Sequence, residues 1–321
     1  MSTMKAAVLY EIGTSPKYDE FPEPKEHGDF VKVSMIASTI KQLDRGRVSG
    51  RHYMKYTKFP TAVGIDGVGR LEDGQLVYCF GDGMIAEKSL VEKGKYAPLS
   101  NDVDPYIAAA LPNTLLGSDM ALLFRAEIKK GDVVLVNGAT GVTGSVAVQI
   151  AKIRGASKVI AAGRNEEALK KLQADYGVDE ILVLNSEEGV AAQMKQILDK
   201  QPIDIVLDYL WGQPTEMIIK SIVAQKQYHV TKIVSVGEMA GSSINLPSAA
   251  LRSTAISILG SGLGSFPATQ MHTYYKEHLN ELLLLAKQGK LKVDIKIIDL
   301  KDIEKEWLVN EKSVRTVVKI N

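Results

Sequence analysis

Hydrophobic and polar positions follow two different patterns along the 321-residue chain. Before about residue 112, short apolar runs separated by glycine or proline predict β-strands at 5–10, 30–37, 64–70, 76–80 and 84–87. A helical turn is expected after Ser38, and the segment between Pro22 and Gly28 is expected to be a loop. This part of the chain therefore predicts a small barrel or compact sheet.

From about residue 113 onward, strand and helix patterns alternate. Strands are predicted at 133–137, 158–162, 181–184, 203–208, 230–236 and 255–259, with helices at 142–154, 165–176, 188–200 and 214–225. Such an alternation predicts an α/β fold with a doubly wound parallel sheet. A helix at 270–288 follows. Late strands at 293–298 and 314–320 are expected to return to the first domain.

A glycine-rich turn lies between the strand at 133–137 and the next helix. Its glycines are Gly138, Gly141 and Gly144. Missing side chains let a backbone approach phosphates closely, and the N–H groups of a helix start point at them. The strand before and the helix after favour a dinucleotide pyrophosphate site over an ordinary βα turn.

Two other nucleotide motifs do not match the spacing. A phosphate-binding loop of the nucleotide hydrolases ends in Gly-Lys-Ser/Thr, whereas this stretch ends in Thr143-Gly144-Ser145 without a lysine. Tyr228 and Lys232 form Tyr-x-x-x-Lys, as in short-chain dehydrogenases, but the pair leads into a strand pattern. The two side chains would stack only on a helix.

Arg164 follows the second strand of this domain, where domains that select NAD carry an acidic residue for the ribose 2′-hydroxyl. A guanidinium suits a 2′-phosphate, which an acid would repel. The sequence therefore favours NADPH over NADH, and the alternative is a solvated arginine.

Glycines also end the fifth and sixth strands of the predicted sheet, at Gly237 and Gly260. Ligands bind at the carboxyl ends of such strands, so these positions are expected near the nicotinamide, although each could be an ordinary turn glycine. The predicted cofactor-binding residues are Asn137, Ala139, Thr140, Gly141, Val142, Thr143, Gly144, Gly163, Arg164, Asn165, Val236, Gly237, Gly260 and Ser261.

Composition narrows the possible partners. The formal net charge is +1, so a polyanion or a membrane surface is not expected as the main partner. No apolar run is expected to span a membrane, and the N-terminus lacks a secretory layout. Cys79 is the single cysteine, which leaves no thiolate cluster for a metal. A cytoplasmic protein is expected.

The stretch Leu135–Gly144, with Gln149-Ile150-Ala151-Lys152, resembles the cofactor fingerprint of the medium-chain dehydrogenase/reductases, most closely the zinc-independent quinone oxidoreductases. Val142-Thr143 departs from the usual Gly-Val. Further blocks at 37–44, 48–53, 63–69, 204–208 and 233–237 resemble the same family. The resemblance implies a GroES-like catalytic domain from residues 1–113 and 261–321, a Rossmann NADP-binding domain at 114–260, and a homodimer.

Zinc-dependent members of that family have a cysteine near position 39–40 and Gly-His-Glu near 64–66. Here the residues are Thr39-Ile40 and Gly64-Ile65-Asp66, and the four-cysteine lobe is missing. A lone carboxylate without sulfur or imidazole neighbours is a poor zinc site. No metal is therefore predicted.

The predicted reaction is hydride transfer from NADPH to a quinone or related α,β-unsaturated carbonyl, whose anion is delocalised. By resemblance, Tyr53 lies beside the nicotinamide, and Lys41 replaces a common asparagine. Both are hypothesised to orient the acceptor and stabilise the reduced oxygen. The alternatives are a surface tyrosine and a solvated lysine.

Two other functions are also compatible with the sequence. One is a medium-chain enoyl or alkenal reductase. The other is a weakly catalytic NADPH-binding sensor or nucleic-acid binder. Nucleic acid is disfavoured because no basic stripe with interleaved aromatic residues is present.

Overall fold

The computed structural model describes residues 2–226 and 228–321. Two compact units form within the chain. The first comprises the residues up to Pro112 together with Ala268–Asn321, and the second comprises Asn113–Pro267. The sequence predicted domain boundaries at 113/114 and 260/261.

The second unit is built on a six-stranded sheet of order β11-β10-β9-β12-β13-β14, in which every neighbouring pair is parallel. The strands are β9 (Val133–Asn137), β10 (Lys158–Gly163), β11 (Glu180–Val183), β12 (Ile205–Asp208), β13 (Thr231–Ser235) and β14 (Ile256–Gly260). The helices are α3 (Val142–Ile153), α4 (Glu166–Tyr176), α5 (Glu187–Leu198), α6 (Gly212–Ala224), α7 (Ser248–Ser253) and the 3₁₀ turn η2 (Leu263–Ser265). The predicted α/β fold with a doubly wound parallel sheet is confirmed.

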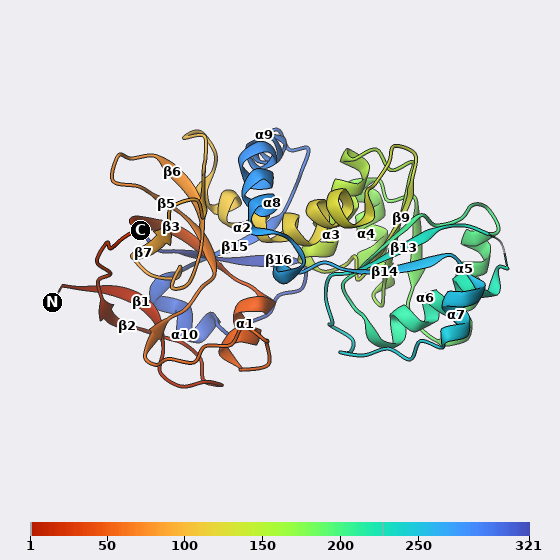
Figure 1. Cartoon of the computed structure of the whole chain (residues 1–321), viewed down its shortest axis with the longest axis horizontal. Helices are drawn as coiled ribbons and strands as arrows, with labels where there is room; N and C mark the ends of the chain where they lie inside the picture. Colours follow the sequence, from red (N-terminus) through yellow and green to blue (C-terminus); the bar gives the residue numbers. More distant parts are fainter. Residues whose placement is uncertain (1, 227) are drawn as a thin grey trace. The chain divides into compact units, whose positions relative to one another are not determined.

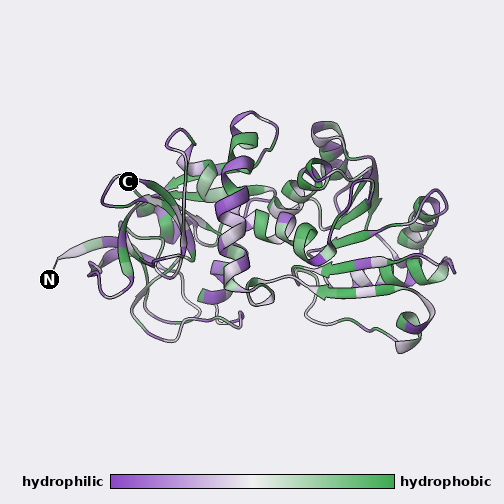
Figure 2. Cartoon of the chain, turned by 45° about the horizontal axis from the view of Figure 1, so that its top comes forward, coloured by the Kyte–Doolittle hydropathy of each residue, from purple (hydrophilic) through white to green (hydrophobic). Residues whose placement is uncertain are grey.

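Helices cover both faces of this sheet, with α3 and α4 on one side and α5 and α6 on the other (Figure 1). The strands are largely hydrophobic (Figure 2), as parallel strands buried on both faces require. Alternate strand residues pack against α5 and α6, among them Val133, Leu135 and Val206. This core holds the strands in place, and the predicted site residues lie at the ends of these strands.

A long apolar helix precedes β9. It begins as α2 (Pro105–Leu115), contains Pro112, and continues with π-helical geometry as η1 (Leu116–Ala126). Its 22 residues are long and apolar enough to cross a membrane by length and composition, which corrects the expectation that no such stretch exists. Most of it is buried within the protein, as the core helix of a folded protein would be.

The first unit is β-rich. A three-stranded sheet has the order β2-β1-β4, and a larger one runs β15-β16-β3-β5-β6-β8, with β7 paired to β3. The strands are β1 (Thr3–Leu9), β2 (Lys17–Pro22), β3 (Phe30–Ile40), β4 (Thr61–Ala62), β5 (Asp66–Arg70), β6 (Leu76–Phe80), β7 (Lys88–Glu92), β8 (Tyr96–Pro98), β15 (Asp294–Asp299) and β16 (Val314–Lys319). Because β16 pairs with β3, the late strands do return to the first part of the chain, as predicted.

Short helices complete the first unit. They are α1 (Gln42–Val48), α8 (Ala268–Tyr274), the π-helical η3 (Tyr275–Leu279), α9 (Asn280–Lys287), the 3₁₀ turn η4 (Leu300–Asp302) and α10 (Ile303–Glu306). The turn predicted after Ser38 is α1, and the predicted helix at 270–288 consists of α8, η3 and α9. Strand β2 was not predicted, since the prolines at its end indicated a loop.

Candidate functional site

The glycine-rich turn has the geometry of a backbone cradle. Gly138 directly follows β9 with φ +96°, a conformation that favours glycine, and Gly141 caps the start of α3. A Cβ on Gly144 would lie 2.3 Å from the Gly138 carbonyl oxygen, so no side chain fits there. At Gly141 the nearest atom would be 3.8 Å away. The first turn of α3 therefore lies directly on the loop, while Gly141 faces open space.

The start of α3 has no side-chain cap among the residues that the structure describes. The N–H groups of a first helical turn have no partner within the helix, and the helix dipole adds positive potential there. Val142 and Thr143 form this turn. The loop and helix start together provide donors for an anionic group such as a diphosphate.

The end of the neighbouring strand β10 lies beside this loop. A Cβ on Gly163 would lie 3.1 Å from Cγ2 of Thr140, so the two turns are in close contact. Arg164 is exposed, and within residues 2–226 and 228–321 its guanidinium makes no ion pair or hydrogen bond. The side chain of Asn165 accepts a hydrogen bond from Ala168 N–H and caps α4. Arg164 is therefore available to an anionic ligand.

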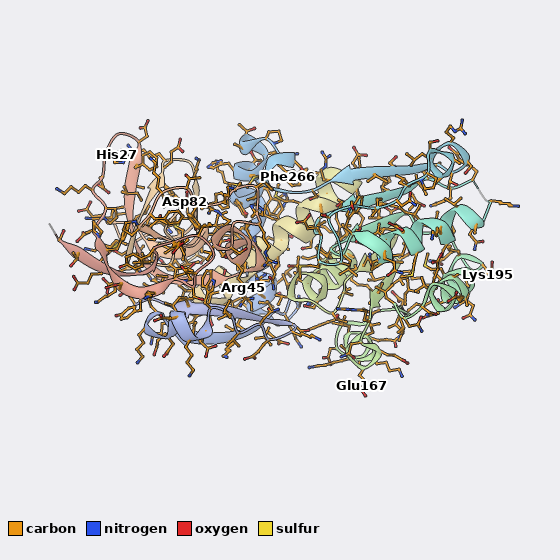
Figure 3. The ribbon with its side chains drawn as sticks, turned by 90° about the horizontal axis from the view of Figure 1, so that it is seen from below. His27, Arg45, Asp82, Glu167, Lys195 and Phe266 are labelled. Atoms are coloured by element: carbon orange, nitrogen blue, oxygen red, sulfur yellow. The ribbon has the colours of Figure 1, made fainter. Side chains whose placement is uncertain are left out.

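Helix α4 carries ordinary surface charges beyond this point. Glu166 and Lys170 form an i,i+4 ion pair at 2.9 Å, as is common on exposed helix faces. Glu167 points away from the body of the second unit, as does Lys195 on α5 (Figure 3). These charges belong to the solvated face and not to the site.

The ends of β13 and β14 provide the remaining predicted cofactor residues. Val236 N–H donates to the Asp208 carbonyl oxygen at 2.7 Å, and a Cβ on Gly237 would lie 2.7 Å from the Tyr209 carbonyl oxygen. Ser261 is buried, and its Oγ has no hydrogen-bond partner among the described residues. A buried hydroxyl without a partner is costly, so this oxygen is suited to meet a polar ligand atom.

The structure thus brings the predicted cofactor residues together along one edge of the sheet, at the carboxyl ends of β10, β9, β13 and β14. Sequence reasoning missed Asp208, Tyr209 and Gly117. Tyr209 OH donates to the Gly117 carbonyl oxygen, and both residues are buried. The available signal was polarity, because Asp208 ends an otherwise apolar strand.

The Tyr-x-x-x-Lys spacing does not form a catalytic pair. Lys232 lies on β13, and its ammonium donates to the Ala126 carbonyl oxygen at 2.7 Å. Tyr228 precedes that strand with its side chain 85% exposed. The prediction that this motif lies at a strand and not on a helix is confirmed.

In the first unit, Lys41 lies in a buried cluster of charges. Its Nζ is 2.6 Å from Asp66 Oδ1, 2.8 Å from Thr39 Oγ1 and 3.0 Å from Asp44 Oδ2. The residue is 2% exposed, so the alternative of a solvated lysine is excluded. The predicted action of Lys41 on an acceptor stays a prediction. Because its ammonium is already held by Asp66, Thr39 and Asp44, any such action would be indirect.

Other polar groups complete this cluster. Tyr78 OH donates to Asp66 Oδ2 at 3.1 Å. Burial raises the pKa of Asp44, opposed by the nearby Lys41 ammonium. Burial lowers the pKa of Arg315, opposed by the charges of Asp66 and Asp44. Two cations and two carboxylates thus share one buried volume, where separate charges would be costly.

Tyr53 lies in the segment after α1 with its side chain 74% exposed. Its ring centroid is 4.2 Å from that of His52. The adjacent Met54 carbonyl oxygen accepts a hydrogen bond from Nε of the buried Arg47 at 2.7 Å. Helix α1 therefore anchors the segment that carries Tyr53, whose contact with an acceptor stays a prediction.

A metal does not fit the residues at the positions where zinc-dependent relatives bind it. Asp66 already binds Lys41 and Tyr78, and Thr39, Ile40 and Ile65 offer neither sulfur nor imidazole. Over residues 2–226 and 228–321, no three His, Cys, Asp or Glu side chains gather as a metal site. Cys79 is buried, and burial raises the pKa of its thiol.

Fold and site together define a protein of the Rossmann class that carries an additional GroES-like β-rich unit. Residues 142–282 match the family model described as zinc-binding dehydrogenase. A probable NADPH-dependent quinone reductase, tdiC, from Emericella nidulans is 29% identical over 294 residues, which cover 78% of this chain and 82% of that protein. These similarities support placing the chain in the medium-chain dehydrogenase/reductase superfamily, in its quinone oxidoreductase branch.

Two further proteins are similar. The NADPH-dependent alkenal/one oxidoreductase of Arabidopsis thaliana chloroplasts is 32% identical over 182 residues, or 49% of this chain and 46% of that enzyme. The quinone oxidoreductase of Thermus thermophilus, whose structure was solved with and without NADPH, is 26% identical. It aligns with a TM-score of 0.80 over 99% of this chain and 100% of that one.

Proposed function

We propose that the protein is an NADPH-dependent oxidoreductase that transfers hydride to quinones or related α,β-unsaturated carbonyls. The observation that carries this proposal is the carboxyl edge of the parallel sheet. There the glycine cradle and the exposed Arg164 follow the neighbouring strands β9 and β10, and Ser261, whose Oγ has no hydrogen-bond partner among the described residues, follows β14. The names of the E. nidulans and T. thermophilus relatives support NADPH and quinone as cofactor and acceptor.

Each group at this edge has a task in the proposal. The backbone from Ala139 to Gly144 and the start of α3 hold the diphosphate, and Arg164 binds the 2′-phosphate. Ser261 Oγ and the backbone at Val236–Gly237 hold the nicotinamide end. NADPH supplies the hydride when it is bound. The bare backbone suits this role, because a Cβ at Gly144 would clash with the Gly138 carbonyl oxygen and the Ala139 backbone and would push the start of α3 off the loop.

On the acceptor side, Tyr53 is the residue proposed to orient the acceptor, because it is largely exposed and carries a hydroxyl. Lys41 is proposed to support it indirectly, since its ammonium is held by Asp66 and Thr39. The two-electron reduction is completed when solvent supplies a proton, to the anionic oxygen of a reduced quinone or to the α-carbon of the enolate formed from an enone. The protein's main task is thus to position the two reactants.

The reaction is proposed to need no zinc. This rests on the donor set at positions 39–40 and 64–66, which lacks sulfur and imidazole, and on the use of Asp66 by Lys41. A homodimer and a cytoplasmic location remain predictions from the sequence.

The test is oxidation of NADPH followed by its absorbance with a panel of quinones and enones, with NADH in parallel. Quinone-dependent oxidation of NADPH that survives dialysis against a strong chelator is the expected result. Protein that binds NADPH but oxidises none of it with any acceptor would instead support the sensor alternative.

A second acceptor class has its own support. The A. thaliana relative is named for alkenals and alkenones, which are enones and not quinones. With NADPH deuterated at C4, an enone product would retain deuterium at its β-carbon. A higher kcat/KM for enones than for quinones would select the alkenal reductase alternative.

A further inference from the structure

Asp208 is a buried carboxylate at the centre of the carboxyl edge of the parallel sheet, the proposed cofactor edge. The sequence predicted no role for it. It is the last residue of β12, which lies between β9 and β13, and it is 0% exposed. On the face that packs against α5 and α6, β12 carries Val206 and then Asp208, while β9 carries Leu135 and then Asn137. On this face each strand thus ends in a polar residue, and these two residues, Asp208 and Asn137, are paired across the sheet.

These polar residues bond to one another and to α6. Asn137 Nδ2 donates to Asp208 Oδ1 at 2.8 Å, and Thr215 Oγ1 donates to Asp208 Oδ2 at 2.6 Å. Asn137 directly precedes Gly138, the first residue of the glycine cradle. The Asp208 carboxylate therefore fixes the position at which the cradle begins.

The same carboxylate also shapes the turn after β12. Its Oδ1 accepts from Leu210 N–H at 3.0 Å and from Trp211 N–H at 3.1 Å. Trp211 has φ +54°, a conformation that a tryptophan adopts only when its surroundings hold it. This turn contacts the cradle, because a Cβ on Gly138 would lie 3.1 Å from the Leu210 side chain.

The backbone of Asp208 reaches the other side of the edge. Its carbonyl oxygen accepts from Val236 N–H at 2.7 Å and from Gly237 N–H at 3.2 Å. The side chain of Asp208 is thus bonded to Asn137, which lies just before the diphosphate cradle. Its backbone is bonded to Val236 and Gly237, the segment assigned to the nicotinamide end.

We propose that Asp208 is a positioning residue, which sets the spacing between the diphosphate cradle and the nicotinamide segment through Asn137, Thr215 and the turn at 210–211. This inference rests on the proposed binding of NADPH. This role depends on the shape of the side chain and not on its charge. An asparagine at position 208 would offer the same oxygen to Asn137, Leu210 and Trp211, and its amide nitrogen would donate to Thr215.

The test compares three variants by NADPH titration and steady-state kinetics. D208A removes the carboxylate, and D208N keeps its shape. D204A is the matched control, because Asp204 lies just before the other end of β12 and its Oδ2 accepts from Val133 N–H, the first residue of β9, at 2.7 Å. Both alanine variants remove a bond between β12 and β9, but only one does so at the cofactor edge.

For D208A, the Kd and KM for NADPH are expected to rise roughly tenfold, while the KM for the quinone stays within about twofold. D208N restores the wild-type Kd to within about threefold, and D204A leaves it unchanged although both alanine variants lower the unfolding midpoint. Folded D208A that binds NADPH as tightly as the wild type overturns the inference. An equal rise in D204A overturns it as well.

If D208A does not fold, T215V carries the test, since it removes the bond to Oδ2 and, with it, the longer bond that Thr215 Oγ1 accepts from Asn137 Nδ2 at 3.5 Å. A rise in the Kd for NADPH of about threefold supports the positioning role, and an unchanged Kd contradicts it. Wild-type protein that shows no saturable uptake of NADPH would overturn the proposed function itself. Failure of the cofactor site is therefore distinguished from failure of the Asp208 assignment.

Discussion

Asp66 in the first unit and Asp208 in the second are both almost fully buried, yet their partners differ. Asp66 binds the Lys41 ammonium at 2.6 Å and accepts from the Tyr78 hydroxyl. Among the residues that the structure describes, the Asp208 carboxylate accepts from neutral groups alone, namely an amide, a hydroxyl and two backbone N–H groups. The start of α6 follows four residues later and adds positive potential from its dipole.

The difference shows two ways of keeping a carboxylate inside a protein. In the first unit, side-chain cations neutralise the charge, so the cluster depends on charge balance. In the second unit, backbone and neutral side chains satisfy the oxygens, so that cluster depends on geometry. Over the residues that the structure describes, the Asp208 carboxylate is therefore held without a lysine or arginine beside its oxygens.

The sharpest test of this contrast applies the same substitution to both aspartates. D66N leaves Lys41 and Arg315 with one carboxylate fewer in a buried volume, so the free energy of unfolding is expected to fall by about 3–5 kcal/mol. D208N keeps every hydrogen bond and should cost about 1 kcal/mol. Urea denaturation of the two variants measures both values, and equal losses would remove the contrast.

The next largest effect is expected in the glycine cradle. In G144A the added methyl group would meet the Gly138 carbonyl oxygen and the Ala139 backbone, and the strain should lower stability by about 1–3 kcal/mol. G141A is the matched control, because its methyl meets only one atom, at 3.8 Å. Thermal denaturation should separate the two variants, whereas identical melting temperatures would show that the loop relaxes freely.

A smaller effect is expected from R164Q, which removes an exposed cation. The Kd for NADPH should rise about tenfold, as expected for the loss of a charge-assisted hydrogen bond, while the Kd for NADH and the unfolding midpoint stay the same. Fluorescence titration with both dinucleotides checks this. An equal change for NADPH and NADH would remove Arg164 from the 2′-phosphate site.

The smallest effect is expected from Y53F. Loss of one exposed hydroxyl should raise the KM for a quinone about threefold and leave the KM for NADPH and the stability unchanged. Steady-state kinetics with a quinone of low KM measure it. Unchanged kinetics in Y53F would contradict a role of the Tyr53 hydroxyl in orienting the acceptor.

The second unit could be predicted from the sequence because its signals are local. The run from Val133 to Asn137 is a strand, the glycines follow it, and α3 starts at Val142, all within a short stretch of chain. Such short-range patterns of period and turn chemistry need no tertiary information.

The environment of Lys41 could not be predicted in this way. Its partner Asp66 lies 25 residues away, and the neighbouring Arg315 comes from the last strand. Strand β2 was missed for a related reason. Pro22 is compatible with a strand only because β2 is the edge of its sheet, and that position depends on tertiary pairing.

The central claim is that the carboxyl edge of the parallel sheet binds a nicotinamide dinucleotide and prefers the one with a 2′-phosphate. Calorimetric titration of the wild-type protein with NADPH and with NADH tests it directly. Saturable binding of one NADPH per chain, about tenfold tighter than NADH, is the predicted result. No saturable heat with either dinucleotide, or tighter binding of NADH, would contradict it.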